Sequence, residues 1–200
     1  FVAHSQTSTY SNEFLNIGID AASLSQGNSI VSSIDGVCAA YYNPSGIVGQ
    51  KTPMEVSAMH AKYFSGMAQF DYIGFAYKVS DSLSLGLSIV RFGVDDIPNT
   101  LNLVDHNGNV NYDRVSYFSV ADYELLFSLS KKSKIRNLAW GANIKIIYRK
   151  QGEFANAYGF GFDLGARYFY KTWKFGTLLR DATSTFNMWI FNEELFKEAF

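Results

Sequence analysis

The stretch Leu-Ser-Leu-Gly-Leu-Ser-Ile at residues 83–89 decides the fold, because a large aliphatic residue stands at every second position. The residues between, Ser84, Gly86 and Ser88, are small or polar. Successive side chains of an extended strand point to opposite faces, so this strand has one apolar face and one small, polar face. The pattern therefore predicts a β-strand that separates two different environments.

The same alternation recurs in segments of about ten residues, roughly the length that a tilted strand needs to cross the hydrocarbon layer. In the fifth segment, for example, Trp140, Ile144 and Ile146 alternate with Asn143 and Lys145. The predicted strands are 54–64, 70–79, 82–92, 118–130, 137–149, 157–169 and 173–181. We expect an all-β fold: a transmembrane, antiparallel up-and-down β-barrel of about seven strands in a bacterial outer membrane.

Composition agrees with this expectation and excludes other classes of protein. The chain has 17 Phe, 13 Tyr and 3 Trp but only 3 Pro, which suits strands and the aromatic belts of membrane interfaces. It contains no run of 18 apolar residues, so α-helical membrane spans are not expected. A net charge of -1 argues against a nucleic-acid partner. The strand pattern makes outer-membrane lipid an expected partner.

The chain divides into three parts. Residues 1–53 are rich in small residues and lack alternation, which predicts an irregular, short-helical segment packed in or under the barrel, like a hatch. Residues 54–182 carry the strands, joined alternately by short turns and by longer connections such as 93–117. Residues 183–200 are expected to form an extracellular loop with a short helix. An odd strand number leaves open edges, so we expect the chain to be the front part of a longer barrel.

Three motifs each allow two interpretations. Asn43-Pro44-Ser45-Gly46 is turn chemistry, either a hatch anchor below a channel or a rigid entry into the first strand. Residues 105–113 have oxygen ligands at alternate positions, but Asn-Gly at 107–108 favours a hairpin over a calcium loop. The third motif is a set of charges on the predicted lumen faces, which form either a polar path or a cross-linked interior in which Glu124 meets Lys145. Its members are Asp122, Glu124, Lys145, Asp163 and Arg167.

Catalysis has little support in the sequence. His4, His60 and His106 are scattered over different predicted elements, and neither a G-x-S-x-G nor an H-E-x-x-H motif occurs. Cys38 is the only cysteine, so an internal disulfide is impossible, and a buried small residue is its expected role. We therefore predict no catalytic, metal or cofactor site and do not expect an enzyme.

Four stretches resemble one family of membrane proteins. They are residues 14–27 continuing through Asp35 to Tyr41-Tyr-Asn-Pro-Ser-Gly46; residues 92–100; 111–113 with 119–123; and 180–189. Together they resemble the PorV/PorQ family, outer-membrane proteins of the Bacteroidetes type IX secretion system that are related in fold to the FadL fatty-acid transporters. Two features depart from the family pattern: the first segment is polar rather than glycine-rich, and an acidic pair is reduced to Asp35-Gly36.

The resemblance implies a FadL-like barrel that serves type IX secretion as an accessory or cargo-receiving subunit. Its outer loops would contact other secretion-system or surface proteins through aromatic residues, which dominate interface hot spots. The expected contact residues are Tyr112, Tyr117, Phe118, Trp189 and Phe191. The alternative is a FadL-like channel for hydrophobic small molecules or lipids, with residues 1–53 as a movable hatch. The inward residues are mainly small or polar, which disfavours a greasy lumen.

Overall fold

The computed structural model describes residues 12–100, 103–104, 108–182 and 186–192, and an antiparallel sheet dominates them. The strands are β1 (Met54–Tyr63), β2 (Ala68–Ser80), β3 (Leu83–Asn99), β4 (Ser116–Lys132), β5 (Leu138–Gln151), β6 (Ala155–Tyr170), β7 (Trp173–Leu179) and β8 (Phe186–Phe191). The helices are η1 (Glu13–Asn16), α1 (Ala21–Ser25), α2 (Ala39–Tyr42), η2 (Pro44–Gly49), η3 (Phe64–Gly66) and η4 (Tyr112–Arg114). None of the described helices has the length and apolar character that a membrane span requires. The prediction of an all-β fold is confirmed.

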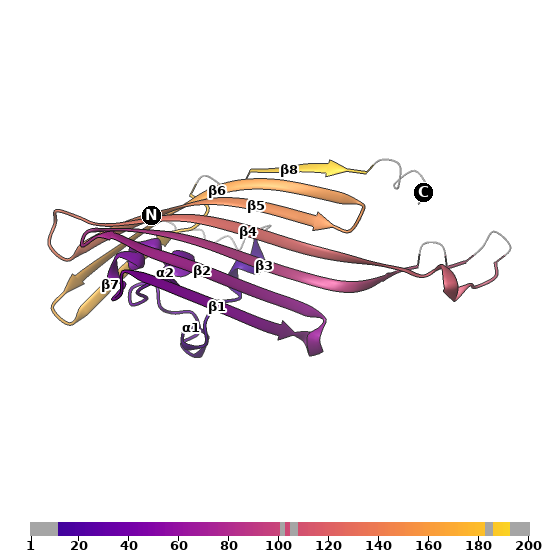
Figure 1. Ribbon diagram of the computed structural model, residues 1–200, viewed down its shortest axis with the longest axis horizontal. Coiled ribbons are helices and arrows are strands. Elements are labelled where there is room, and N and C mark those ends of the chain that lie inside the picture. The colour runs from indigo at the N-terminus through magenta and orange to yellow at the C-terminus, as the bar shows by residue number, and fades with distance from the viewer. Residues whose placement is uncertain (1–11, 101–102, 105–107, 183–185, 193–200) are drawn as a thin grey trace, which may run out of the picture.

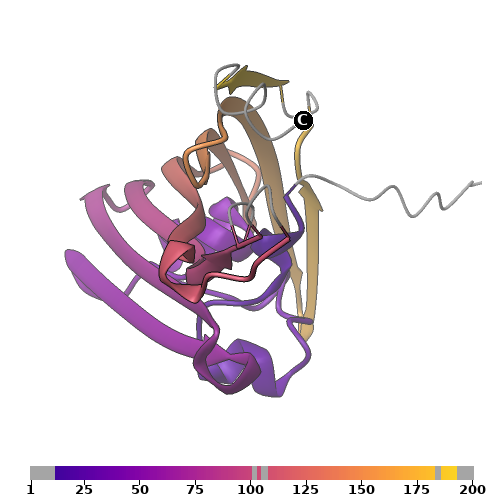
Figure 2. The same ribbon diagram turned by 90° about the vertical axis from the view of Figure 1, so that its right-hand side faces the viewer.

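Strands β1 to β7 lie side by side in chain order, each antiparallel to the next. Residues 81–82, 133–137 and 171–172 connect them at one end of the sheet, which we call the short-turn end. The opposite, long-loop end carries the connection between β3 and β4, whose described residues 108–115 extend to the right in Figure 1. Seen along the strands, the sheet curls into a half-barrel whose concave face surrounds residues 12–50 (Figure 2). We call this enclosed side the lumen.

Strand β8 corrects the prediction that the chain beyond residue 182 is a loop. Register pairs Phe160 of β6 with Phe186 of β8, and Leu164 of β6 with Leu179 of β7. Thus β7 and β8 pair with the same edge of β6, β7 along residues 164–170 and β8 along residues 155–160. The pairing is interrupted between the two strands, and we call this interruption the β7–β8 break. The sequence missed β8 because its six residues, Phe-Asn-Met-Trp-Ile-Phe, are apolar on both faces and do not alternate. Residues 193–200, where a short helix was predicted, lie outside the described residues.

The loop between β3 and β4 is shorter than the predicted 93–117, because both strands continue beyond the alternating core. Consequently Tyr117 and Phe118 are residues of strand β4 rather than of a loop. Within the loop, Val104 and Val110 form a β-bridge, and Gly108 has a φ of 83°. These features agree with the predicted hairpin, although Asn107 itself is not among the described residues.

Residues 12–50, which we call the plug, pack against the concave face of the sheet (Figures 1 and 2). Their apolar side chains meet inward-facing residues of β2, β3 and β4 in one buried cluster. The plug contributes Phe14, Leu15, Ile19, Ile30, Tyr41 and Tyr42, and the strands contribute Phe70, Tyr72, Val90 and Leu126. The lumen of the half-barrel is therefore a packed core on the β2–β4 side and, as described below, a polar one on the β5–β7 side.

Candidate functional site

The turn Asn43-Pro44-Ser45-Gly46 lies in the plug, and all four of its residues are buried. Asn43 caps η2, since its Oδ1 accepts hydrogen bonds from the backbone N–H of Ser45 at 3.2 Å and from its hydroxyl at 2.7 Å. The Asn43 amide donates to the carbonyl of Val31 at 2.8 Å and to that of Thr177 in β7 at 3.3 Å. This side chain therefore joins two parts of the plug to the wall of the sheet.

Glycines on the concave face make this close approach possible. A Cβ atom on Gly141 would lie 2.3 Å from the carbonyl carbon of Pro44, and one on Gly165 would lie 2.1 Å from Oδ1 of Asn43. Both distances are far inside van der Waals contact, so any side chain here would displace the turn. Gly165 of the sixth strand therefore makes room for the turn on the concave face.

Buried polar side chains of the strands hold the plug by its backbone carbonyl groups. Arg167 of β6 donates to the carbonyls of Ile34 and Ser45 and forms an ion pair with Asp35 at 3.0 Å. Asn143 of β5 donates to the carbonyl of Ala40 at 2.8 Å. Arg180, in the break between β7 and β8, donates to the carbonyls of Leu15 at 3.0 Å and Tyr41 at 3.2 Å. The plug is thus fixed from β5, β6 and the β7–β8 break.

The predicted cross-linked lumen is present, but with different partners. Lys145 forms its ion pairs with Asp163, at 2.8 Å, and with Asp181 from the β7–β8 break, not with Glu124. Register explains the difference, because Glu124 lies opposite Ile147 whereas Gly161, which has no side chain, lies opposite Lys145. The Lys145 side chain can therefore extend toward β6.

Glu124 is left in an unusual position. It is 2% exposed, and its Oε1 has no hydrogen-bond partner among the described residues. A cavity of about 10 Å³ adjoins it, lined also by Tyr41, Lys145, Asp163 and Arg180. That volume suits about one water molecule, which such a site needs to satisfy the carboxylate.

The convex face has the opposite character. Its side chains form continuous rows across the strands, as the register shows, and the middle row consists of large apolar residues that are 37% to 68% exposed. That row is Val56, Phe75, Leu87, Phe127, Ile144 and Phe162. The next row toward the long-loop end includes Ile73, Ile89, Ile146 and Phe160, all of them exposed. A third apolar row, on the short-turn side of the middle row, includes Leu85 and Leu164. We call these three rows together the apolar band.

Rings with polar tips bound the apolar band at both ends. Toward the long-loop end, Tyr123 and Tyr148 stack with centroids 6.0 Å apart, and Tyr148 lies 5.1 Å from Tyr158. Toward the short-turn end, Tyr168 and Tyr170 follow on the same face of β6 and pair with Phe175 and Trp173. From Tyr158 to Tyr168 the strand runs about 33 Å at roughly 3.3 Å per residue, which becomes about 25 Å across a layer if the strand tilts by about 40°.

The predicted contact residues do not form one site. Tyr112 is 77% exposed on η4, and Tyr117 is 67% exposed on β4. Phe118 instead packs edge-on against Phe154, with centroids 5.4 Å apart. Trp189 and Phe191 stack on each other at 6.1 Å on the concave side of β8. Strand β8 lies away from residues 112–114 of the connection between β3 and β4 (Figure 1). Trp189 and Phe191 therefore lie on a strand and not in the predicted loop, and of the five residues only Tyr112 lies in a connection between strands.

Comparisons with protein-family models, with curated proteins and with solved structures find no match. The family resemblance drawn from the sequence motifs therefore remains a hypothesis. The described residues also contain no group of three or more His, Cys, Asp or Glu side chains placed to hold a metal ion.

Proposed function

We propose that this chain forms the wall of a bacterial outer-membrane β-barrel whose lumen is occupied by the plug. The observation that carries the proposal is the polarity of the two faces. Large apolar side chains are exposed on the convex face, while Glu124, Lys145 and Arg167 are buried on the concave face. Soluble proteins bury apolar surface and rarely expose apolar patches beyond a few hundred Å². In a lipid bilayer, by contrast, the outer face of a barrel must be apolar because it contacts hydrocarbon.

The dimensions of the convex face support the same proposal. Outer-membrane barrels have an apolar band about 25 Å tall between two aromatic girdles, on strands tilted by about 35–45°. The estimated height between Tyr158 and Tyr168 agrees with that value. The connection of residues 100–115 lies at the end opposite the 81–82 and 171–172 turns, and outer-membrane barrels likewise carry their longer loops at one end.

A matched pair of substitutions tests the proposal. Ile144→Lys places a charge in the middle row of the apolar band, and Ile135→Lys makes the same change in the turn between β4 and β5. In lipid we expect Ile144→Lys to lower the free energy of unfolding by about 2–4 kcal/mol. Ile135→Lys should change it by less than about 0.5 kcal/mol, as most exposed positions do. Two equally small effects, measured by urea unfolding in phospholipid vesicles, would reject a lipid-facing convex side.

The more specific role that we propose is an accessory or cargo-receiving subunit of the type IX secretion system. It rests on the motif resemblance, and the polar contacts that hold the plug to the strands support it over a channel for hydrophobic small molecules. The presence of a hatch-like plug is the observation that favours the channel as a second candidate. Replacing residues 100–115 by a short turn separates the two roles: loss of secretion-machinery partners supports the first, whereas retained partners with co-purified lipophilic ligand support the second.

A further inference from the structure

A cavity of about 550 Å³ opens at the short-turn end, between the end of the plug and the ends of four strands. The plug contributes Asp35 and residues 48–50, and the remaining walls come from β2, β4, the 133–137 turn, β5 and β6. Its volume falls within the range of about 300–1,000 Å³ that small-ligand sites occupy. Neither the plug contacts nor the apolar band accounts for it.

Positive charge dominates the lining of this cavity. Lys78, Lys132, Arg136 and Arg167 contribute cations, and Asp35 is the single acidic residue of the lining. Asp35 is already paired with Arg167. Lys78 pairs with Asp81 at 2.8 Å, but the Asp81 side chain is 97% exposed, so solvent screens that pair. Within the described part of the chain, no carboxylate lies within ion-pair distance of Lys132 or Arg136.

The wall also contains a buried donor that the protein leaves unsatisfied. Arg167 is 2% exposed, and its Nε–H has no acceptor among the described residues. Leaving a buried charged donor without an acceptor is costly, so such groups usually meet water or a ligand. The ring of Phe169, 5.4 Å from the guanidinium carbon, adds an apolar surface to the same wall.

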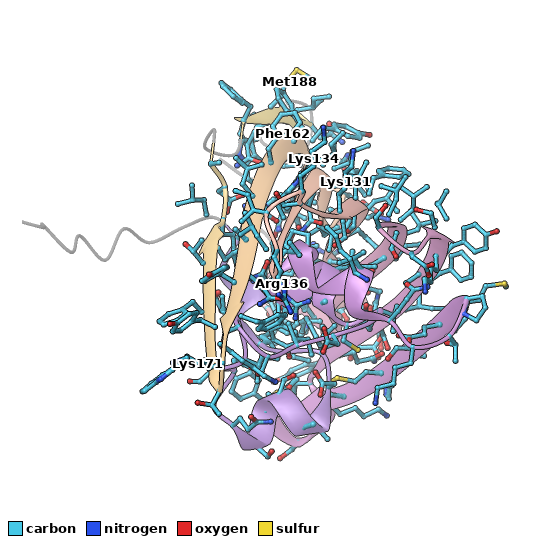
Figure 3. The ribbon with its side chains drawn as sticks, turned by 90° about the vertical axis from the view of Figure 1, so that its left-hand side faces the viewer. Lys131, Lys134, Arg136, Phe162, Lys171 and Met188 are labelled. Atoms are coloured by element: carbon cyan, nitrogen blue, oxygen red, sulfur yellow. The ribbon has the colours of Figure 1, made fainter. Side chains whose placement is uncertain are left out.

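Figure 3 looks onto the short-turn end and separates two sets of basic side chains. Arg136 lies over the concave interior, whereas Lys131, Lys134 and Lys171 lie on the rim. A charged rim around a charged cavity raises the local concentration of anions. Arg136 can offer two parallel N–H donors and Lys132 a compact positive charge, which is the combination that recognises phosphate.

We propose that this cavity binds a phosphate group carried by a larger organic molecule. Lys132 and Arg136 bind the phosphate oxygens, and Ile135, Leu138 and Phe169 contact the apolar remainder of the ligand. A volume of about 550 Å³ exceeds what a phosphate ion alone fills. Two sources share this chemistry: a phospholipid headgroup at the membrane surface and a soluble phosphate ester. The site does not depend on the convex face being embedded in lipid.

The test uses the full chain in nonionic detergent at low ionic strength, titrated with inorganic phosphate and followed by ³¹P NMR. The double variant Lys132→Gln/Arg136→Gln should weaken binding by about tenfold or more, since two charge-assisted contacts are lost. The matched control is Lys131→Gln/Lys134→Gln, which removes the same charge from the rim and should change binding by less than about threefold. No binding by the unaltered chain, or equal losses in the two variants, would overturn the proposal.

Competition then identifies the source of the phosphate. Displacement of inorganic phosphate at lower concentrations of dihexanoyl phosphatidylglycerol than of glycerol phosphate supports a phospholipid headgroup. The reverse order supports a soluble ester. Binding of either ligand depends on the Lys132 and Arg136 side chains. The competition is therefore repeated with Lys132→Gln/Arg136→Gln, in which both ligands should bind more weakly.

Discussion

Lys145 is the residue whose removal tests the buried charge cluster most directly. It is 1% exposed, and its ammonium group pairs with Asp163 and Asp181, whose side chains are only 6% and 14% exposed. Lys145→Met keeps the length and apolar stem of the side chain but deletes the charge. Two buried carboxylates then lose their cation, and Glu124 lies beside the same small cavity.

The expected cost follows from this burial. Removing one partner of a buried ion pair leaves an uncompensated charge and typically costs about 3–5 kcal/mol, equivalent to a fall of roughly 10²- to 10⁴-fold in the folding equilibrium constant. The matched control is Lys150→Met on the same strand, where the side chain is exposed and the change should stay within about 0.5 kcal/mol. Denaturant unfolding of the full chain in detergent micelles, followed by tryptophan fluorescence, measures both.

A rescue variant makes the reasoning refutable in a second way. Combining Lys145→Met with Asp163→Asn and Asp181→Asn removes the charges together, and replacing all partners of a buried pair is often close to neutral. We expect the triple variant to recover more than half of the stability lost by Lys145→Met. A loss no greater than that of Lys150→Met, or a triple variant weaker than the single one, would refute the assignment of this cluster as a stabilising one.

Two further predictions concern the plug. Gly165→Ala should cost about 1–3 kcal/mol in the same unfolding assay, because its Cβ would lie 2.1 Å from Asn43 Oδ1, whereas Ala142→Val on the convex face should cost less than about 0.5 kcal/mol; equal costs would contradict the fit. Burial raises the pKa of the Cys38 thiol, so less thiolate is present at pH 8 and iodoacetamide should alkylate the folded chain more slowly than the unfolded one. Equal rates, quantified by mass spectrometry, would show that the plug leaves Cys38 open to solvent.

The strands were predictable because one physical rule governs all of them. Alternation gives β5 as 137–149 against the observed Leu138–Gln151, and β6 as 157–169 against Ala155–Tyr170. The predicted outward side of β5, with Trp140 and Ile144, is the exposed side in the structure. Strand ends were less accurate, because β3 and β4 continue past their alternating cores into residues with mixed faces.

The candidate site was only partly predictable. The sequence places Glu124, Lys145 and Asp163 on inward faces, but their pairing depends on register and on which neighbour lacks a side chain. Asp181 was missed because it lies in a break of the strand, with a φ of 51°, that alternation does not encode. Arg180 was missed for the same reason. The only available signal was that Arg180 and Asp181 stand where the alternation of the seventh predicted strand ends. That signal did not indicate that their side chains turn inward.

The contacts of the plug bear on which of the two proposed roles the barrel serves. A hatch that opens for a small molecule must release Asn43 from the carbonyl of Thr177 in β7, and must release Asn143, Arg167 and Arg180 from carbonyl groups of the plug. At about 1.5 kcal/mol for each of these four side chains the opening costs at least roughly 6 kcal/mol, so only about one molecule in twenty-five thousand would be open at equilibrium. A spontaneous channel is therefore disfavoured. A barrel that remains closed and offers its long-loop end to other proteins has no such cost, and this favours the accessory role.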